Sequence, residues 1–115
     1  MTGAAQIVDL IRSACAAYAV SNCPALTDAR PPTVRPVANA ATFQFVDGTR
    51  KIWVNPEAAR TMGLAELRRV IFHEVAHART WDEFGVAVRP HGREFRRVCA
   101  SVALMRPFDC DSFDD

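Results

Sequence analysis

Apolar residues recur at helical spacing in two long stretches of the chain. Within residues 4–20 they fall on one face of a helix: Ile7, Leu10, Ile11, Ala14 and Tyr18. From Leu64 to about Trp81 the same intervals of three and four residues return, at Leu64, Leu67, Val70, Ile71, Val75 and Ala78. This spacing predicts two amphipathic helices, each with an apolar face that needs a core to cover it.

Residues 41–55 alternate between apolar and other side chains, which is the pattern of a β-strand. The alternating apolar positions stand on both sides of an Asp-Gly pair at 47–48, and they are Phe43, Phe45, Ile52 and Val54. Asp-Gly is favoured in two-residue hairpin turns because both central positions take positive φ angles. The pattern therefore predicts an antiparallel hairpin.

Shorter segments link these elements. Four prolines between Asn22 and Asn39 predict a loop, because proline lacks a backbone donor and fixes φ; a short strand is expected near Val34–Val37. Asn55 and Pro56 predict the start of a short helix that runs to Met62 and is stopped by Gly63, since Asn caps exposed amides and Pro suits the first helical position.

The C-terminal part is predicted to hold one more helix. After a loop at residues 82–90, this helix runs from Gly92 to Met105, where Pro107 stops it. It is expected to bury Phe95, Val98, Cys99 and Val102 and to turn Arg93, Arg96, Arg97 and Arg106 to water. The acidic residues of the tail are expected to be frayed and solvated, without a function: Asp109, Asp111, Asp114 and Asp115.

These elements, several helices and a short antiparallel hairpin, give an α+β fold class. The chain has 115 residues and 12.7 kDa, so we expect a single domain over residues 1–115. Half of the residues are apolar and 23% are charged, which suits a chain that buries a core. The net charge of +1 gives no reason to expect non-specific nucleic-acid binding.

The sequence also bears on location and on the cysteines. No window approaches the roughly 18 apolar residues of a membrane span, and no signal peptide is indicated, so a cytoplasmic protein is expected. The four cysteines never form Cys-x-x-Cys, and we expect buried free thiols at Cys15, Cys23, Cys99 and Cys110. A bridge between Cys15 and Cys23 is the alternative, which an oxidising compartment would permit.

The long predicted helix carries the motif His73-Glu74-Val75-Ala76-His77, an H-E-x-x-H pattern. Four residues at about 100° each return to within about 40° of the start, so both histidines project from one face and can bind a Zn²⁺. Glu74 lies beside that face and can take a proton from water that the metal activates. The motif therefore predicts a site for metal-assisted hydrolysis.

A catalytic zinc needs three protein ligands and one open position. His91 is the third and last histidine, and the loop that separates it from His77 is long enough to bring it back to the metal. Glu94, one helical turn beyond, is the competing third ligand. The extended metzincin pattern is not met, because Thr80 and Glu83 stand where that pattern needs Gly and His.

These residues resemble the signature of a known family. His73-Glu74-Val75-Ala76-His77-Ala78, then Trp81, then His91-Gly92-Arg93-Glu94-Phe95 look like the H-E-x-x-H-A and H-G-x-x-F/W motifs of SprT-like zinc metalloproteases, the group that includes the Spartan-type proteases. The segment Ile52-Trp53-Val54-Asn55 before the short helix is also similar to that family's layout. The resemblance covers about residues 40–105.

The resemblance implies a small zincin-like core in which the H-E-x-x-H helix and flanking helices pack against a short antiparallel sheet. It implies zinc held by His73, His77 and His91, with Glu74 as general base in the hydrolysis of peptide bonds in a protein or peptide substrate. An exposed strand of the hairpin could hold such a peptide as an added strand. Longer family members carry a zinc ribbon or DNA-binding segments that this sequence does not show, so nucleic acid remains only an alternative partner.

Two other interpretations stay open. One is a zinc-binding domain that has lost turnover and acts in partner or nucleic-acid binding; the other is a metal-free helical module whose arginine-rich last helix binds an acidic partner. Trp81 and Phe95 are expected in the core rather than in a substrate pocket. Asp82 and Glu83 are the candidates for outer hydrogen-bond partners of the histidines. No pattern indicates an oligomeric state.

Overall fold

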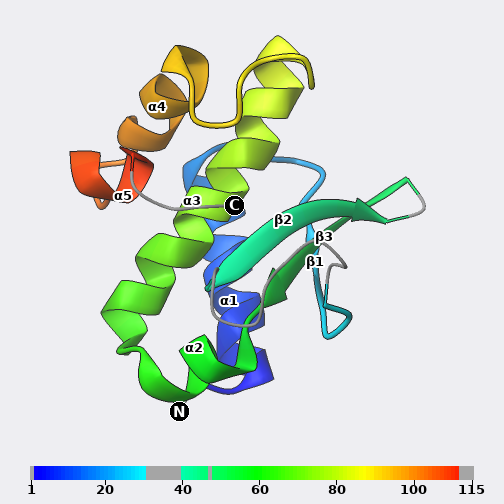
Figure 1. The fold of residues 1–115 in the computed structure, drawn as a ribbon, viewed down its shortest axis with the longest axis vertical. Coiled ribbons are helices and arrows are strands. Elements are labelled where there is room, and N and C mark those ends of the chain that lie inside the picture. Colours follow the sequence, from blue (N-terminus) through cyan, green and yellow to red (C-terminus); the bar gives the residue numbers. More distant parts are fainter. Residues whose placement is uncertain (1, 31–39, 47, 112–115) are drawn as a thin grey trace.

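The computed structural model describes residues 2–30, 40–46 and 48–111, which form helices and a small sheet (Figure 1). In chain order the elements are α1 (Ala4–Ala17), β1 (Ala25–Thr27), β2 (Ala41–Val46), β3 (Thr49–Val54), α2 (Pro56–Thr61), α3 (Leu64–Phe84), α4 (Arg93–Ala100) and α5 (Pro107–Asp111). The mixture of helices with a three-stranded sheet confirms the predicted α+β class.

The sheet has the strand order β1-β3-β2. The antiparallel hairpin of β2 and β3 is confirmed, with Phe43 opposite Ile52. Asp47 of the predicted turn lies outside the described residues, as does the strand expected near Val34–Val37. The parallel pairing of β1 with β3 was not predicted, because three residues in a proline-rich stretch give too short a pattern to indicate a strand.

α3 is the central element, and α1, α4, α5 and β2 all pack against it. Its predicted apolar face is buried, with Leu67, Ile71 and Val75 fully enclosed, and α1 contributes Ile7 and Ile11 to the same core. The helix continues three residues beyond the predicted end near Trp81, to Phe84. It stops at Gly85, whose φ of +84° suits glycine because other side chains are strained there.

The C-terminal part differs from the sequence prediction. α4 ends at Ala100, five residues before the expected end at Met105, and Pro107 begins α5 instead of stopping a helix. Proline is tolerated at the first helical position because the missing N–H has no helical partner there. The prediction of a solvated tail is wrong for Asp109, which is 2% exposed.

All four cysteines form disulfides, so the prediction of free thiols is wrong. Cys15 and Cys23 have their Cα atoms 5.9 Å apart and join α1 to the segment before β1. Cys99 and Cys110, 5.8 Å apart, join α4 to α5. Both separations lie in the range that a disulfide bridges. Among the described residues, no helix is long and apolar enough to cross a membrane.

Candidate metal centre

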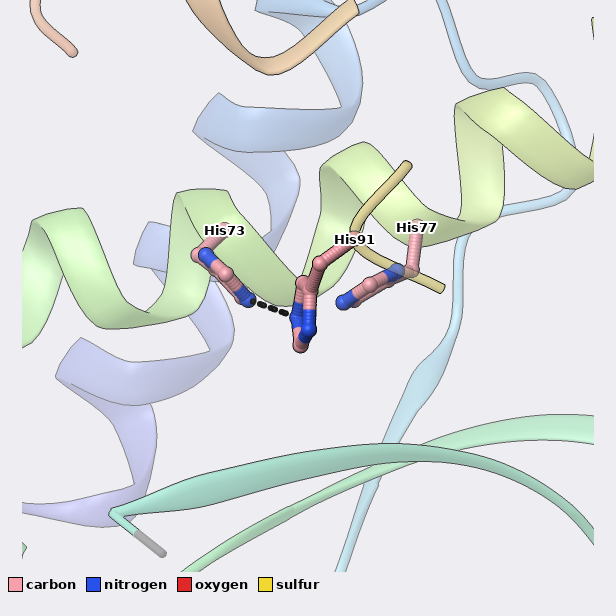
Figure 2. Close-up of side chains that lie close together, drawn as sticks. All are labelled: His73, His77 and His91. Carbon is pink, nitrogen blue, oxygen red and sulfur yellow. Dashed lines mark hydrogen bonds between the residues drawn. The ribbon is translucent and has the colours of Figure 1, made fainter. Parts of the chain in front are cut away.

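Three histidine side chains meet beside α3 (Figure 2). His73 and His77 project from one face of this helix, and His91 reaches them from the segment just before α4. The ring centroids are 5.0 to 5.2 Å apart in all three pairs. One ligand nitrogen from each ring lies within 4.8 Å of the other two, so this group could hold a metal ion. It is the one such group that the described ranges contain.

One pair of donor atoms in this group has the spacing of two ligands of one metal ion. Nδ1 of His73 lies 2.7 Å from the main-chain carbonyl oxygen of Asp109. Because a carbonyl only accepts, Nδ1 carries the proton and leaves the lone pair of Nε2 directed at the other histidines. Nε2 of His73 lies 3.2 Å from Nε2 of His91. Two nitrogens bound to one zinc at about 2.0–2.1 Å stand about 3.3 Å apart, so this pair is already at the right spacing.

The turn before α4 directs His91 toward α3. Gly92 precedes α4, and its N–H donates to the carbonyl of Arg89 at 3.1 Å. A Cβ at position 92 would stand 3.1 Å from Cβ of Arg89, so glycine fits the close approach of the chain in this turn. Glu94, the competing ligand, is not a member of the histidine group. The structure thus brings together His73, His77 and His91.

Glu74 is buried between α3 and the sheet, with 2% of its surface exposed. Its Oε1 accepts a hydrogen bond of 2.8 Å from the main-chain N–H of Phe43 in β2. Its Oε2 lies 4.0 Å from Nε2 of His73. The carboxylate is therefore held beside the histidine group, with one oxygen bound to the strand and the other toward the histidines.

Phe95 forms an apolar wall against all three histidines. Its ring stacks on His77 with a centroid distance of 4.1 Å, and it meets His73 at 4.9 Å and His91 at 5.2 Å edge-on. Phe95 is fully buried, so the expectation that it belongs to the core is confirmed. Its position also restricts the freedom of the histidine rings and keeps water from that side of them.

Trp81 was also expected in the core, but this prediction is wrong, because Trp81 lies outside the core cluster and is only partly buried. Together with Phe43, His77 and Pro90 it lines a hollow of about 160 Å³ next to the histidines. The ring of Phe45 stacks on Trp81 with centroids 5.1 Å apart, and Phe43 meets Trp81 edge-on at the same distance. An aromatic pocket thus adjoins the histidine group.

The outer hydrogen-bond partner of His73 differs from the candidates that the sequence offered. It is the carbonyl of Asp109, on α5, and not Asp82 or Glu83. Asp82 pairs with Arg50, and Glu83 pairs with Arg79. The residue that could have pointed to Asp109 is Arg69. It lies one helical turn before His73 and pairs with the Asp109 carboxylate at 3.4 Å. The sequence does not show this pairing, because it depends on α5 folding back onto α3.

Electrostatics keep the Asp109 carboxylate charged in its buried position. Burial alone would raise the pKa of Asp109, but hydrogen bonds from Arg106 and the charges of Arg106 and Arg69 outweigh burial and hold the pKa below its ordinary value. Tyr18, the single tyrosine, donates its hydroxyl to the carbonyl of Cys99 at 2.8 Å. Burial, and then the charge of Asp109, raise the pKa of Tyr18.

Comparison with known proteins gives one family. The model of the SprT-like family matches residues 13–112. Protein SprT of Vibrio parahaemolyticus is 48% identical over 52 residues, which are 45% of this chain and 31% of that protein. Protein SprT of Pasteurella multocida is 34% identical over 64 residues, 56% of this chain and 38% of that protein.

Protein SprT of Pseudomonas fluorescens strain Pf-5 is 32% identical over 60 residues, 52% of this chain and 37% of that protein. The chain therefore matches only about a third of the length of these curated relatives. No solved structure matches it.

Proposed function

Because the chain belongs to the SprT-like family, we propose that it is a zinc-dependent metallopeptidase that hydrolyses peptide bonds. In this proposal His73, His77 and His91 bind the zinc, and Glu74 is the general base. The observation that carries it is the convergence of one nitrogen from each histidine within 4.8 Å, with the Glu74 carboxylate held beside them by β2.

Zinc is the metal that this donor set favours. Three neutral imidazoles with one remaining position are the ligand set of several catalytic zinc sites. Imidazole also binds copper, iron and nickel, but within the described part of the chain no carboxylate joins the histidine group, as it would in a 2-His-1-carboxylate iron site. Bound zinc supplies Lewis acidity, which polarises a carbonyl and makes water more acidic.

Glu74 has the position that a general base needs. The H-bond from Phe43 fixes Oε1, and Oε2 remains directed toward the place where the histidine nitrogens converge. In the proposed reaction Glu74 takes a proton from the attacking water and then gives it to the leaving amine. His73, oriented by the carbonyl of Asp109, stays in one tautomer throughout.

The edge of β2 is suited to hold the substrate chain. Among the described residues β2 pairs only with β3, so its other edge has no partner strand. The N–H of Phe43 points to that edge, where it is taken up by Glu74, so an added peptide would bond the carbonyl of Phe43 and the main chain of Phe45 instead. In an antiparallel pair such groups alternate, so the main chain of Phe45 points the same way. We propose that an extended peptide adds to this edge next to the histidines.

The aromatic pocket is proposed to select the side chain beside the cleaved bond. Its walls are Phe43, Trp81, Pro90 and the ring of His77, so whatever fills it lies next to the metal. An apolar cavity of about 150 Å³ is large enough to bind benzene, and this pocket has about 160 Å³. The substrate class is therefore a protein or peptide with a medium-sized apolar residue beside the scissile bond.

The test compares wild type with Glu74→Gln. Both proteins are measured for zinc content and for cleavage of labelled casein, with cut sites identified by mass spectrometry. We expect about one zinc per chain in both, cleavage next to apolar residues in the wild type, and a rate about 10²–10⁴-fold lower in the variant. Zinc in both proteins with no cleavage by either would favour a zinc-binding domain without turnover.

A further inference from the structure

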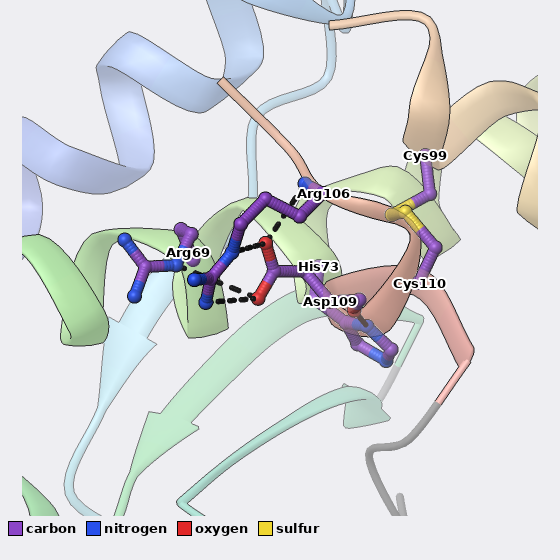
Figure 3. A network of polar contacts seen from close by, with 6 residues as sticks. All are labelled: Arg69, His73, Cys99, Arg106, Asp109 and Cys110. Carbon is purple, nitrogen blue, oxygen red and sulfur yellow. Dashed lines mark hydrogen bonds and ion pairs between the residues drawn. A yellow bond between two sulfur atoms is a disulfide. The ribbon is translucent and has the colours of Figure 1, made fainter. Parts of the chain in front are cut away.

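Asp109 contacts α3 at two points that are one helical turn apart (Figure 3). Its carbonyl oxygen lies 2.7 Å from Nδ1 of His73, and its carboxylate pairs with Nε of Arg69 at 3.4 Å. The carboxylate also accepts from the main-chain N–H of Arg106 at 2.9 Å and from its side chain at 3.2 Å. These contacts place the carbonyl of Asp109 against His73.

The segment that carries Asp109 is short and depends on a covalent link. α5 spans only Pro107–Asp111, which is too short to be stable as an isolated helix. Cys110, next to Asp109 in the chain, is bonded to Cys99 near the end of α4 (Figure 3). The same α4 carries Phe95, which packs on the histidine rings. The disulfide thus holds α5, and with it the carbonyl, in a fixed place relative to the site.

We propose that α5 positions His73 for metal binding and that the Cys99–Cys110 disulfide maintains this position, so that its reduction weakens the metal affinity of the site. The inference rests on the metal site of the proposed function. Groups that orient a metal-binding histidine typically change metal affinity about 10–100-fold when they are removed. We expect an effect of that size on reduction, because the carbonyl is then held only by noncovalent contacts such as those of Asp109 with Arg69 and Arg106.

The chain contains its own control. The Cys15–Cys23 disulfide closes a loop of similar length, with a sequence separation of 8 against 11 for Cys99–Cys110. The two bonds are therefore expected to make similar contributions to the stability of the fold. Cys15 and Cys23, however, lie on α1 and the segment before β1, which supply none of the three histidines. A general loss of stability and a specific loss of histidine orientation can thus be separated.

The experiment measures zinc affinity by competition with a chromophoric chelator, before and after reduction. The reductant is a water-soluble phosphine, because thiol reagents bind zinc themselves. The phosphine takes the oxygen of one water molecule and becomes a phosphine oxide, and the two hydrogens of that water remain on the two cysteine sulfurs. Thiol titration reports the extent of reduction. The proteins are wild type, Cys99→Ser with Cys110→Ser, and Cys15→Ser with Cys23→Ser.

The proposal expects the Cys99/Cys110 variant to bind zinc about 10–100-fold more weakly than wild type without reductant, and to respond little to the phosphine. The Cys15/Cys23 variant is expected to match wild type until it is reduced, and then to weaken. Equal affinity of all three proteins, or equal losses in both variants, would overturn the proposal. Absence of zinc from oxidised wild type would instead overturn the proposed function.

A second variant keeps the test decisive if the Cys99/Cys110 variant does not fold, which circular dichroism reports. Arg106→Ala leaves both disulfides intact and removes the side-chain contacts to Asp109. Its expected effect is a several-fold loss of zinc affinity. The melting temperature of the metal-free protein is expected to fall as well, because the buried Asp109 carboxylate loses one of its two arginines, so zinc affinity is compared at a temperature at which circular dichroism shows the variant folded. Unchanged zinc affinity in this variant would count against a positioning role of α5.

Discussion

The main-chain N–H of Phe43 and the carboxylate of Glu74 are joined by a hydrogen bond of 2.8 Å that crosses from β2 to α3. The donor belongs to a strand edge that has no partner strand within the described residues. The sheet therefore fixes one oxygen of the carboxylate, while the other faces the histidines. The position of the proposed base and the proposed peptide-binding edge are set by the same residue of β2.

Shortening the Glu74 side chain tests this relationship. Glu74→Asp removes one methylene, so the carboxylate cannot both accept from Phe43 and stand where Oε2 stands now. We expect a loss of about 100-fold or more in kcat for casein or peptide cleavage, because a general base must reach its proton within hydrogen-bond distance. Zinc content is the control and is expected to stay at that of wild type. Activity within a few-fold of wild type would show that the contact with Phe43 is not needed.

Alanine substitutions test which of His91 and Glu94 is the third metal ligand. His91→Ala leaves only two histidines in the group, so zinc content after dialysis is expected to fall to well under one half per chain. Glu94→Ala is the matched control, since Glu94 lies one turn further along and outside the group. Elemental analysis of untagged protein gives the readout. Zinc that is lost from Glu94→Ala and kept by His91→Ala would refute the three-histidine site.

Local patterns in the sequence were sufficient for the elements that surround the site. The histidine spacing on a periodic helix predicted that His73 and His77 share a face, and the alternation of residues 41–55 predicted the hairpin. Both patterns act over a few residues, so that no knowledge of distant contacts was needed. His91 was also named from sequence, because it is the last histidine of a set of three.

The features of the site that the sequence did not predict depend on contacts between segments that are far apart in the chain. The role of Asp109 requires α5 to fold back on α3, across 36 residues from His73. An acidic tail after Pro107 has the composition of a solvated end, and burial of Asp109 becomes favourable through the disulfide and the two arginines that contact its carboxylate. The position of Phe43 relative to Glu74 is likewise a contact across 31 residues, which no periodicity encodes.

The ion pair of Arg50 and Asp82 connects β3 to α3 and is predicted to stabilise the fold. Arg50 is 8% exposed, and its guanidinium also donates to the carbonyl of Asn22 at 3.3 Å. Asp82→Ala leaves this buried cation without its carboxylate, so the free energy of unfolding is expected to fall by about 2 kcal/mol. Urea denaturation followed by circular dichroism measures it.

The exposed pair of Arg60 and Glu57 is the control for that experiment, with side chains 56% and 64% exposed. Water and salt screen such a pair, so Glu57→Ala is expected to leave the free energy of unfolding unchanged within error. Equal effects of the two substitutions would show that burial of Arg50 does not make its pair stronger.

The burial of Tyr18 predicts that the folded protein loses stability at alkaline pH. Its ring is 4% exposed, and its hydroxyl donates to the carbonyl of Cys99. Burial, with the charge of Asp109, raises the pKa of the folded-state phenol above the ordinary value of 10.0, which applies in the unfolded chain. Above pH 10 the unfolded chain therefore loses this proton while the folded protein retains it.

The contribution of the protonated Tyr18 to the free energy of unfolding is therefore complete below pH 10. It falls as the pH rises above 10, by up to about 1.4 kcal/mol per pH unit. Tyr18→Phe removes the titrating group. At pH 7 it is expected to cost about 1 kcal/mol, since the carbonyl of Cys99 loses its donor, but the difference between the two proteins should shrink between pH 10 and 11. Urea denaturation of both proteins at pH 7, 9, 10 and 11 measures this difference, in which the contributions of all other groups cancel. A difference that stays constant or grows with pH would contradict the assignment of a buried, neutral Tyr18.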